Sequence, residues 1–274
     1  MAITYLVDLA CRVKPHVRAS KMLRLLYQRD RANEALNKAR RKAPGVPADG
    51  VRVNLTIKDS KGKASLAVTT AAEILGRFEE LDRHASLCEQ CPARVGAYAF
   101  GCRGEIHLPI SLRGEAWLMG LIRGAAEDPT PKLLLNYLAS NGVVGHRVAE
   151  MRRVPEVFFE SQKALTRRYD SGGKLSVNQV FELLFMTETI SARHARFLLG
   201  VFDLYAAGLP LERPISDFTD LRVFEHREGD RPVARNGLRA VAQREDDATI
   251  REYKAFFQAM FLACELGCDL KVSL

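Results

Sequence analysis

Residues 51–69 read VRVNLTIKDSKGKASLAVT, and this stretch carries the clearest structural signal in the chain. Its first half alternates apolar and polar residues, and Leu66 and Val68 continue the alternation in its second half. Because successive side chains of a strand point to opposite faces, the pattern predicts a β-hairpin with one buried face and a turn at residues 59–62. The residues expected on the outer face are Arg52, Asn54, Thr56, Lys58, Ser65, Ala67 and Thr69.

The segments on both sides of this hairpin extend the pattern. Residues 3–13 alternate like a strand, and Ser20 is a suitable N-cap for an amphipathic helix that ends near Lys42. After the hairpin, Thr70 and Glu73 have the spacing of a capping box that opens a helix over 71–87, and residues 104–110 alternate again. The order βαββαβ predicts a ferredoxin-like domain, with four strands in one antiparallel sheet and both helices on one face.

Beyond residue 113 the patterns are those of helices. We expect helices over 115–123, 131–139, 147–153, 154–168, 177–187, 191–207 and 248–266, and 269–274 could add an edge strand. The predicted class is therefore α+β. Its predicted domains are a ferredoxin-like N-terminal domain with a metal-binding insertion (1–113) and an all-helical C-terminal domain (114–274).

Three of the six cysteines lie close together between the second helix and the last strand. Cys88, Cys91 and Cys102 have the spacing C-x₂-C-x₁₀-C, which suits a tetrahedral thiolate site for structural zinc. His84 is the expected fourth ligand because it precedes Cys88 by one helical turn, and Cys11 and His107 are the alternatives. An iron–sulfur cluster is the other interpretation, although it calls for a fourth cysteine nearby.

The excess of positive over negative charge lies near the N-terminus. The chain has 41 Lys and Arg against 33 Asp and Glu, and residues 1–50 hold 11 of the former and 4 of the latter. This excess predicts a basic face on the helix that ends near residue 42. Such a face could bind RNA or DNA phosphates or an acidic protein surface, or it could simply be exposed to solvent. The predicted contacts are Lys21, Arg24, Arg31, Lys38, Arg41 and Lys42. The outward sheet positions offer no aromatic platform for stacking bases, so we expect little sequence preference.

Catalytic motifs are absent from the sequence. It contains no G-x-S-x-G, P-loop or H-E-x-x-H, and no catalytic residue is predicted. We therefore expect a non-enzymatic, zinc-stabilised nucleic-acid-binding protein. The alternatives are an adaptor that docks an acidic partner and a ferredoxin-like RNA-processing nuclease with His107 or His84 as general base. The apolar runs are too short to span a membrane, and the N-terminus lacks the basic start of a secretory signal, so the expected location is the cytoplasm.

Overall fold

The computed structural model of the chain describes residues 2–58, 64–88, 91–93, 100–122, 130–169, 173–204, 224–228, 231–234 and 238–274. The chain forms two compact units, Cys11–Cys91 and a larger unit made of Met1–Ala10 and Pro92–Leu274. Both units combine helices with antiparallel strands, which confirms the α+β class. In the described ranges, each helix is too short or too polar to cross a bilayer.

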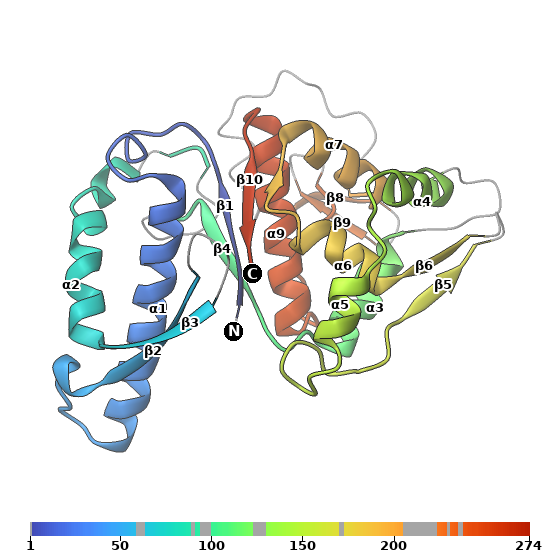
Figure 1. Cartoon of the computed structure of the whole chain (residues 1–274). Helices are drawn as coiled ribbons and strands as arrows, with labels where there is room; N and C mark the ends of the chain where they lie inside the picture. The colour runs from blue at the N-terminus through green and yellow to red at the C-terminus, as the bar shows by residue number, and fades with distance from the viewer. Residues whose placement is uncertain are drawn as a thin grey trace. The chain divides into compact units, whose positions relative to one another are not determined.

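Two helices and a hairpin make up the Cys11–Cys91 unit (Figure 1). Along the chain these are α1 (Ala19–Lys42), the 3-10 helix η1 (Ala48–Gly50), β2 (Arg52–Lys58), β3 (Ala64–Thr70), α2 (Ala71–Asp82) and the 3-10 helix η2 (Ala85–Cys88). α1 and α2 lie side by side. Their apolar faces and the hairpin share one buried core, which contains Ala32, Leu36, Val51, Val53, Leu55, Ala71 and Ile74.

The predicted hairpin is confirmed, but its second strand presents the opposite face. Asn54 pairs with Val68, and Leu55 pairs with Ala67. Residues directly opposite each other share a face, so Leu66 and Val68 lie on the outer face and both are exposed. The sequence prediction that buried them, with Ser65, Ala67 and Thr69 outward, was therefore wrong. The alternation within one strand does not determine its register, and a shift by one residue exchanges the two faces.

Of the two N-caps predicted for the helices of this unit, the one of α2 is found and the one of α1 is not. The N-cap of α2 is Thr70, whose hydroxyl accepts from the Glu73 backbone N–H at 3.2 Å, as predicted. The Glu73 carboxylate accepts from the Thr69 hydroxyl. In contrast, α1 is preceded by Arg18, which provides no side-chain cap, and Ser20 lies inside the helix. The cap predicted at Ser20 was wrong because the helical backbone already begins at Ala19.

An antiparallel sheet from distant parts of the sequence organises the larger unit. Its strand order is β4 (Arg103–His107), β1 (Ala2–Val7), β10 (Leu270–Ser273) and β7 (Thr189–Ile190). Helix α9 (Ala248–Glu265) packs against β1 and β4, where Tyr5 meets Phe256 edge to face with ring centroids 5.2 Å apart. Tyr5 pairs with Gly104, and a Cβ at residue 104 would lie 2.2 Å from the Tyr5 hydroxyl. Glycine thus lets the tyrosine ring lie across the neighbouring strand.

This sheet differs from the predicted ferredoxin-like one. β1 and β4 are neighbours, as predicted, but β10 occupies the other side of β1. Among the described strands, β2 and β3 pair with each other alone. The predicted single sheet of 3–13, 51–58, 63–69 and 104–110 is thus not formed. Because β1, β4 and β10 share a sheet, a boundary at residue 113 would separate paired strands.

The remainder of the larger unit contains α3 (Leu112–Leu121), α4 (Thr130–Ser140), α5 (His146–Met151), α6 (Val177–Phe185) and α7 (Ala192–Val201). The prediction of an all-helical region was wrong, because β5 (Thr166–Arg168) pairs with β6 (Lys174–Ser176), and β8 (Phe224–Glu228) pairs with β9 (Arg231–Ala234). The helix predicted over 154–168 is not formed. Glu156 has a φ of +57°, which a right-handed helix does not accommodate.

Candidate functional site

The predicted metal ligands lie in both compact units. His84, Cys88 and Cys91 belong to the Cys11–Cys91 unit, and Cys102 belongs to the larger unit. α2 ends at Asp82, so His84 follows the helix and Cys88 ends η2. The expectation that His84 and Cys88 share one face of a continuous α-helix was therefore wrong. Cys88 and Cys102 are buried, and the backbone N–H of Cys91 donates to the Cys88 carbonyl at 3.2 Å.

In the part of the chain that the structure describes, no three His, Cys, Asp or Glu side chains are grouped so that they could hold one metal ion. Zinc therefore stays a prediction. One contact that the spacing does not reveal is the stacking of His16 on His84, with ring centroids 4.6 Å apart and ring planes 9° apart. Of the alternative ligands, Cys11 is half-buried, and His107 binds a carboxylate of α9 instead.

The basic residues of α1 have two kinds of environment. Some of them have acidic partners, since Lys21 pairs with Glu80 at 2.6 Å and Arg31 pairs with Glu34 at 2.9 Å. Arg29 pairs with Asp30 at 2.9 Å and lies 4.6 Å from the Phe78 ring centroid. The other predicted contacts are exposed, namely Arg24, Lys38, Arg41 and Lys42, together with Arg40. Of the six predicted nucleic-acid contacts, four thus keep an exposed cationic group without an acidic partner among the described residues.

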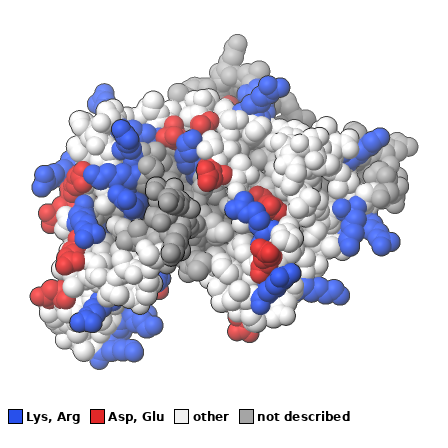
Figure 2. Space-filling model, viewed as in Figure 1, with Lys and Arg blue, Asp and Glu red and all other residues white. Residues whose placement is uncertain are grey.

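The excess positive charge coincides with one compact unit. The Cys11–Cys91 unit contains 17 Lys and Arg and 9 Asp and Glu, whereas the rest of the chain contains 24 of each. The formal net charge of +8 therefore belongs to this unit alone. Figure 2 shows Lys and Arg side chains over this unit, with a group at the lower end where α1 ends. Because α1 ends in Arg40, Arg41 and Lys42, part of their charge also offsets the negative end of the helix dipole.

The exposed face of the hairpin has no aromatic side chain at its described positions. On β2 it presents Arg52 and Asn54, and on β3 it presents Leu66 and Val68. Tyr5, the aromatic residue of the first strand, is buried against α9 in the larger unit. The described positions of this face therefore offer no ring on which a base could stack.

A histidine held by a carboxylate is the best-defined acid–base group of the larger unit. His107 Nδ1 lies 2.7 Å from one carboxylate oxygen of Glu252, and its backbone N–H donates to the other oxygen at 2.7 Å. Its Nε2 lies 3.7 Å from Glu105, and 66 % of the side chain is exposed. The hydrogen bond to Glu252 and the charges of Glu252 and Glu105 raise the pKa of His107, although partial burial opposes them. The Glu252 carboxylate orients the ring through Nδ1 and the backbone N–H.

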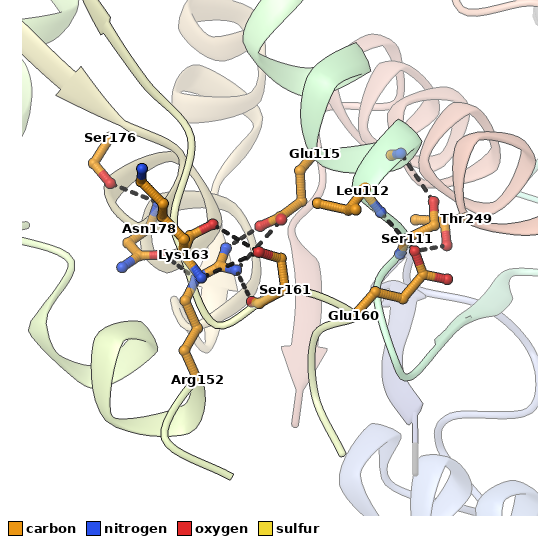
Figure 3. Close-up of polar contacts among 11 residues, drawn as sticks. Ser111, Leu112, Glu115, Arg152, Glu160, Ser161, Lys163, Ser176, Asn178 and Thr249 are labelled. Carbon is orange, nitrogen blue, oxygen red and sulfur yellow. Dashed lines mark hydrogen bonds and ion pairs between the residues drawn. The ribbon is translucent and has the colours of Figure 1, made fainter. Parts of the chain in front are cut away.

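A buried cluster centred on Arg152, the residue that follows α5, contacts Glu115 of α3 and Asn178 of α6 (Figure 3). The Arg152 guanidinium pairs with Glu115, donates to Asn178 Oδ1 at 2.6 Å and to the Ser161 carbonyl at 2.7 Å, and lies 3.9 Å from the Phe159 ring centroid. Burial lowers the pKa of Arg152 to about 10, so it remains charged at neutral pH. Sequence patterns do not reveal this cluster, because its members are far apart in the chain. Glu115, Arg152 and Asn178 are buried, so we interpret the cluster as structural.

Comparison of the chain with protein-family models, with curated proteins and with solved structures finds no match in any of the three.

Proposed function

We propose that this chain is a binding protein whose Cys11–Cys91 unit engages nucleic-acid phosphates through the end of α1. The observation that supports this proposal most is the exposed group Lys38, Arg40, Arg41 and Lys42, in the unit that carries the whole charge excess. These side chains lie within five residues on the last turn and a half of the helix, about 8 Å of its length. Phosphate contacts of this kind position a protein on nucleic acid without reading its bases.

The proposal modifies the set of contacts predicted from sequence. Lys21 and Arg31 already have acidic partners, so binding a phosphate would require them to exchange one ion pair for another. No acidic partner within the described ranges would have to be given up by Arg24, Lys38, Arg41 or Lys42. We therefore expect these four to dominate the interaction and Lys21 and Arg31 to contribute less.

The experiment that tests this proposal compares two triple variants of the full chain. Lys38→Gln, Arg41→Gln and Lys42→Gln together should weaken the affinity for single-stranded RNA at least tenfold at about 50 mM salt. The matched control, Arg147→Gln, Lys163→Gln and Lys174→Gln, removes the same charge from exposed positions of the larger unit and should leave affinity within about twofold. Equal losses in both variants would show that only net charge matters. If the wild type ignores RNA and DNA under these conditions, an acidic protein surface is the better partner.

Structural zinc is the second part of the proposal, with Cys88, Cys91 and Cys102 as ligands and His84 as the fourth. Its support is the thiolate spacing and the backbone hydrogen bond from Cys91 to the Cys88 carbonyl, which keeps the two residues close together. Elemental analysis of protein purified without chelator should give one zinc per chain, lost in Cys88→Ser. Protein free of both zinc and iron would contradict the site. Clustered thiols of this kind suit a reducing compartment, so the proposed location is the cytoplasm.

The contact between His107 and Glu252 supports one rival, a metal-independent nuclease. A carboxylate that fixes a histidine through Nδ1 leaves Nε2 able to take a proton from a ribose hydroxyl. The rival requires cleavage of labelled RNA in EDTA that His107→Ala abolishes and His146→Ala retains. Because a base must be deprotonated, this cleavage would increase as the pH rises through the raised pKa of His107. Absence of cleavage in the wild type would exclude the rival.

A further inference from the structure

The outer face of the β2–β3 hairpin presents two large aliphatic side chains side by side. Leu66 is 69 % exposed and Val68 is 59 % exposed, whereas Val53 and Leu55 on the inner face are each 3 % exposed. Residues two apart in a strand lie about 7 Å from each other on the same face, so Leu66 and Val68 form one continuous apolar surface. Single exposed apolar residues are common, whereas contiguous exposed apolar surface marks interaction sites as it grows, and these two residues are the centre of such a surface.

The polar residues around this pair indicate the charge of its occupant. Asn54 lies directly opposite Val68, and the exposed Arg52 is two residues farther along the same face of β2. The unit as a whole holds 17 basic residues against 9 acidic ones. An occupant of this face therefore gains from negative charge at its margin and from aliphatic side chains at its centre.

Two other occupants fit these observations less well. A second copy of this chain would bring together two faces from units that each carry a net charge of +8, and like charges oppose that contact. Nucleic acid would match Arg52, but its bases stack on aromatic rings, whereas Leu66 and Val68 are aliphatic. A protein segment with both aliphatic and acidic residues matches both features.

We propose that the outer face of the hairpin, centred on Leu66 and Val68, is a docking site for an acidic amphipathic helix of a partner protein. Helices α1 and α2 already share a core with the inner face of this hairpin, so a third helix on the outer face would complete a layer on each side of the sheet. The leucine or isoleucine stripe of the incoming helix covers Leu66 and Val68, and its flanking carboxylates lie near Arg52. This site is separate from the phosphate-binding residues of α1 proposed above and does not depend on them.

The test uses the full chain and a fluorescent synthetic peptide of about 18 residues, long enough to form a helix. The peptide carries leucines at helical spacing on one face and glutamates beside them. Wild-type protein should bind it, and Leu66→Ser with Val68→Thr should weaken binding at least tenfold in fluorescence anisotropy. The matched control is Leu133→Ser with Val144→Thr, which changes side chains that are 53 % and 70 % exposed on the larger unit and should leave binding unchanged.

Three results would overturn the proposal. Equal binding by wild type and the Leu66/Val68 variant would show that the pair is not involved. Equal binding of a peptide with serines in place of its leucines would show attraction by charge alone. Self-association in sedimentation velocity that the Leu66/Val68 variant abolishes would identify a second copy as the occupant. Because all four substitutions are at exposed positions, unchanged thermal unfolding establishes that each variant is folded.

Discussion

The contact between His107 and Glu252 should make the stability of the protein depend on pH. Its pKa is raised above the ordinary value of 6.5, first by the hydrogen bond to Glu252. A raised pKa in the folded state means that the contact stabilises the protein below pH 6.5, and that this stabilisation is lost as the pH rises through the folded value. The wild type should therefore exceed His107→Gln in melting temperature by more at pH 6 than at pH 8.5.

Differential scanning calorimetry of both proteins at the two pH values measures this difference. His146→Gln is a suitable control, because His146 is 68 % exposed and its carboxylate neighbour Glu150 lies farther away, at 3.8 Å. A melting-temperature difference for His107→Gln that is the same at both pH values would show that Glu252 does not favour the charged imidazole.

The Glu115–Arg152 ion pair should contribute more to the free energy of unfolding than the His107–Glu252 contact does. Both side chains are almost fully buried, and Glu115→Gln would leave the guanidinium facing a neutral group. Breaking such a pair from one side costs about 3–5 kcal/mol. Urea unfolding should show this loss for Glu115→Gln and a change below about 0.5 kcal/mol for the exposed control Glu150→Gln. Equal changes would mean that the buried pair adds nothing to the free energy of unfolding.

At the scale of elements, replacing each of two glycines by alanine should change the free energy of unfolding in opposite directions. Gly104 in β4 lies against the Tyr5 hydroxyl, so Gly104→Ala forces a buried ring to move and should cost about 1–3 kcal/mol. Gly76 in α2 has nothing within 4 Å of its would-be Cβ, so Gly76→Ala should gain up to about 1 kcal/mol from helix propensity. Chemical unfolding of both variants measures the signs, and a stabilising Gly104→Ala would contradict the packing of Tyr5 on β4.

Local elements such as β2 and α2 could be predicted from sequence, but the strand that pairs with β1 on its other side and the register of the hairpin could not. The alternation in β2 and the Thr70 cap of α2 are local, and both predictions are confirmed. β10 pairs with β1 across the chain, as the contact between Thr4 and Ser273 shows, and no local period encodes a pairing between the two ends. The exposure of Leu66 and Val68 depends on register, and the pairing of Lys21 with Glu80 depends on α2 lying beside α1.

At the scale of the whole molecule, charge and fold divide the chain in the same way. The unit Cys11–Cys91 holds the entire net charge of +8, and the larger unit is neutral. Most of this excess lies within the first 50 residues, which the sequence alone shows because charge counts need no tertiary information. Which cations have acidic partners depends on the fold, and this distinction reduces six predicted contacts to the four that we expect to dominate binding.

The salt dependence of nucleic-acid binding tests the central claim most directly. Each phosphate contact that releases counterions contributes about −0.7 to −0.9 to the slope of log K against log salt. For the wild type, titrations with single-stranded RNA and with double-stranded DNA of unrelated sequences should give slopes of about −2 to −4 and similar affinities. The variant that combines Lys38→Gln, Arg41→Gln and Lys42→Gln should reduce the magnitude of the slope by about 2. A wild-type slope near zero, or one that this variant leaves unchanged, would contradict phosphate binding by the end of α1.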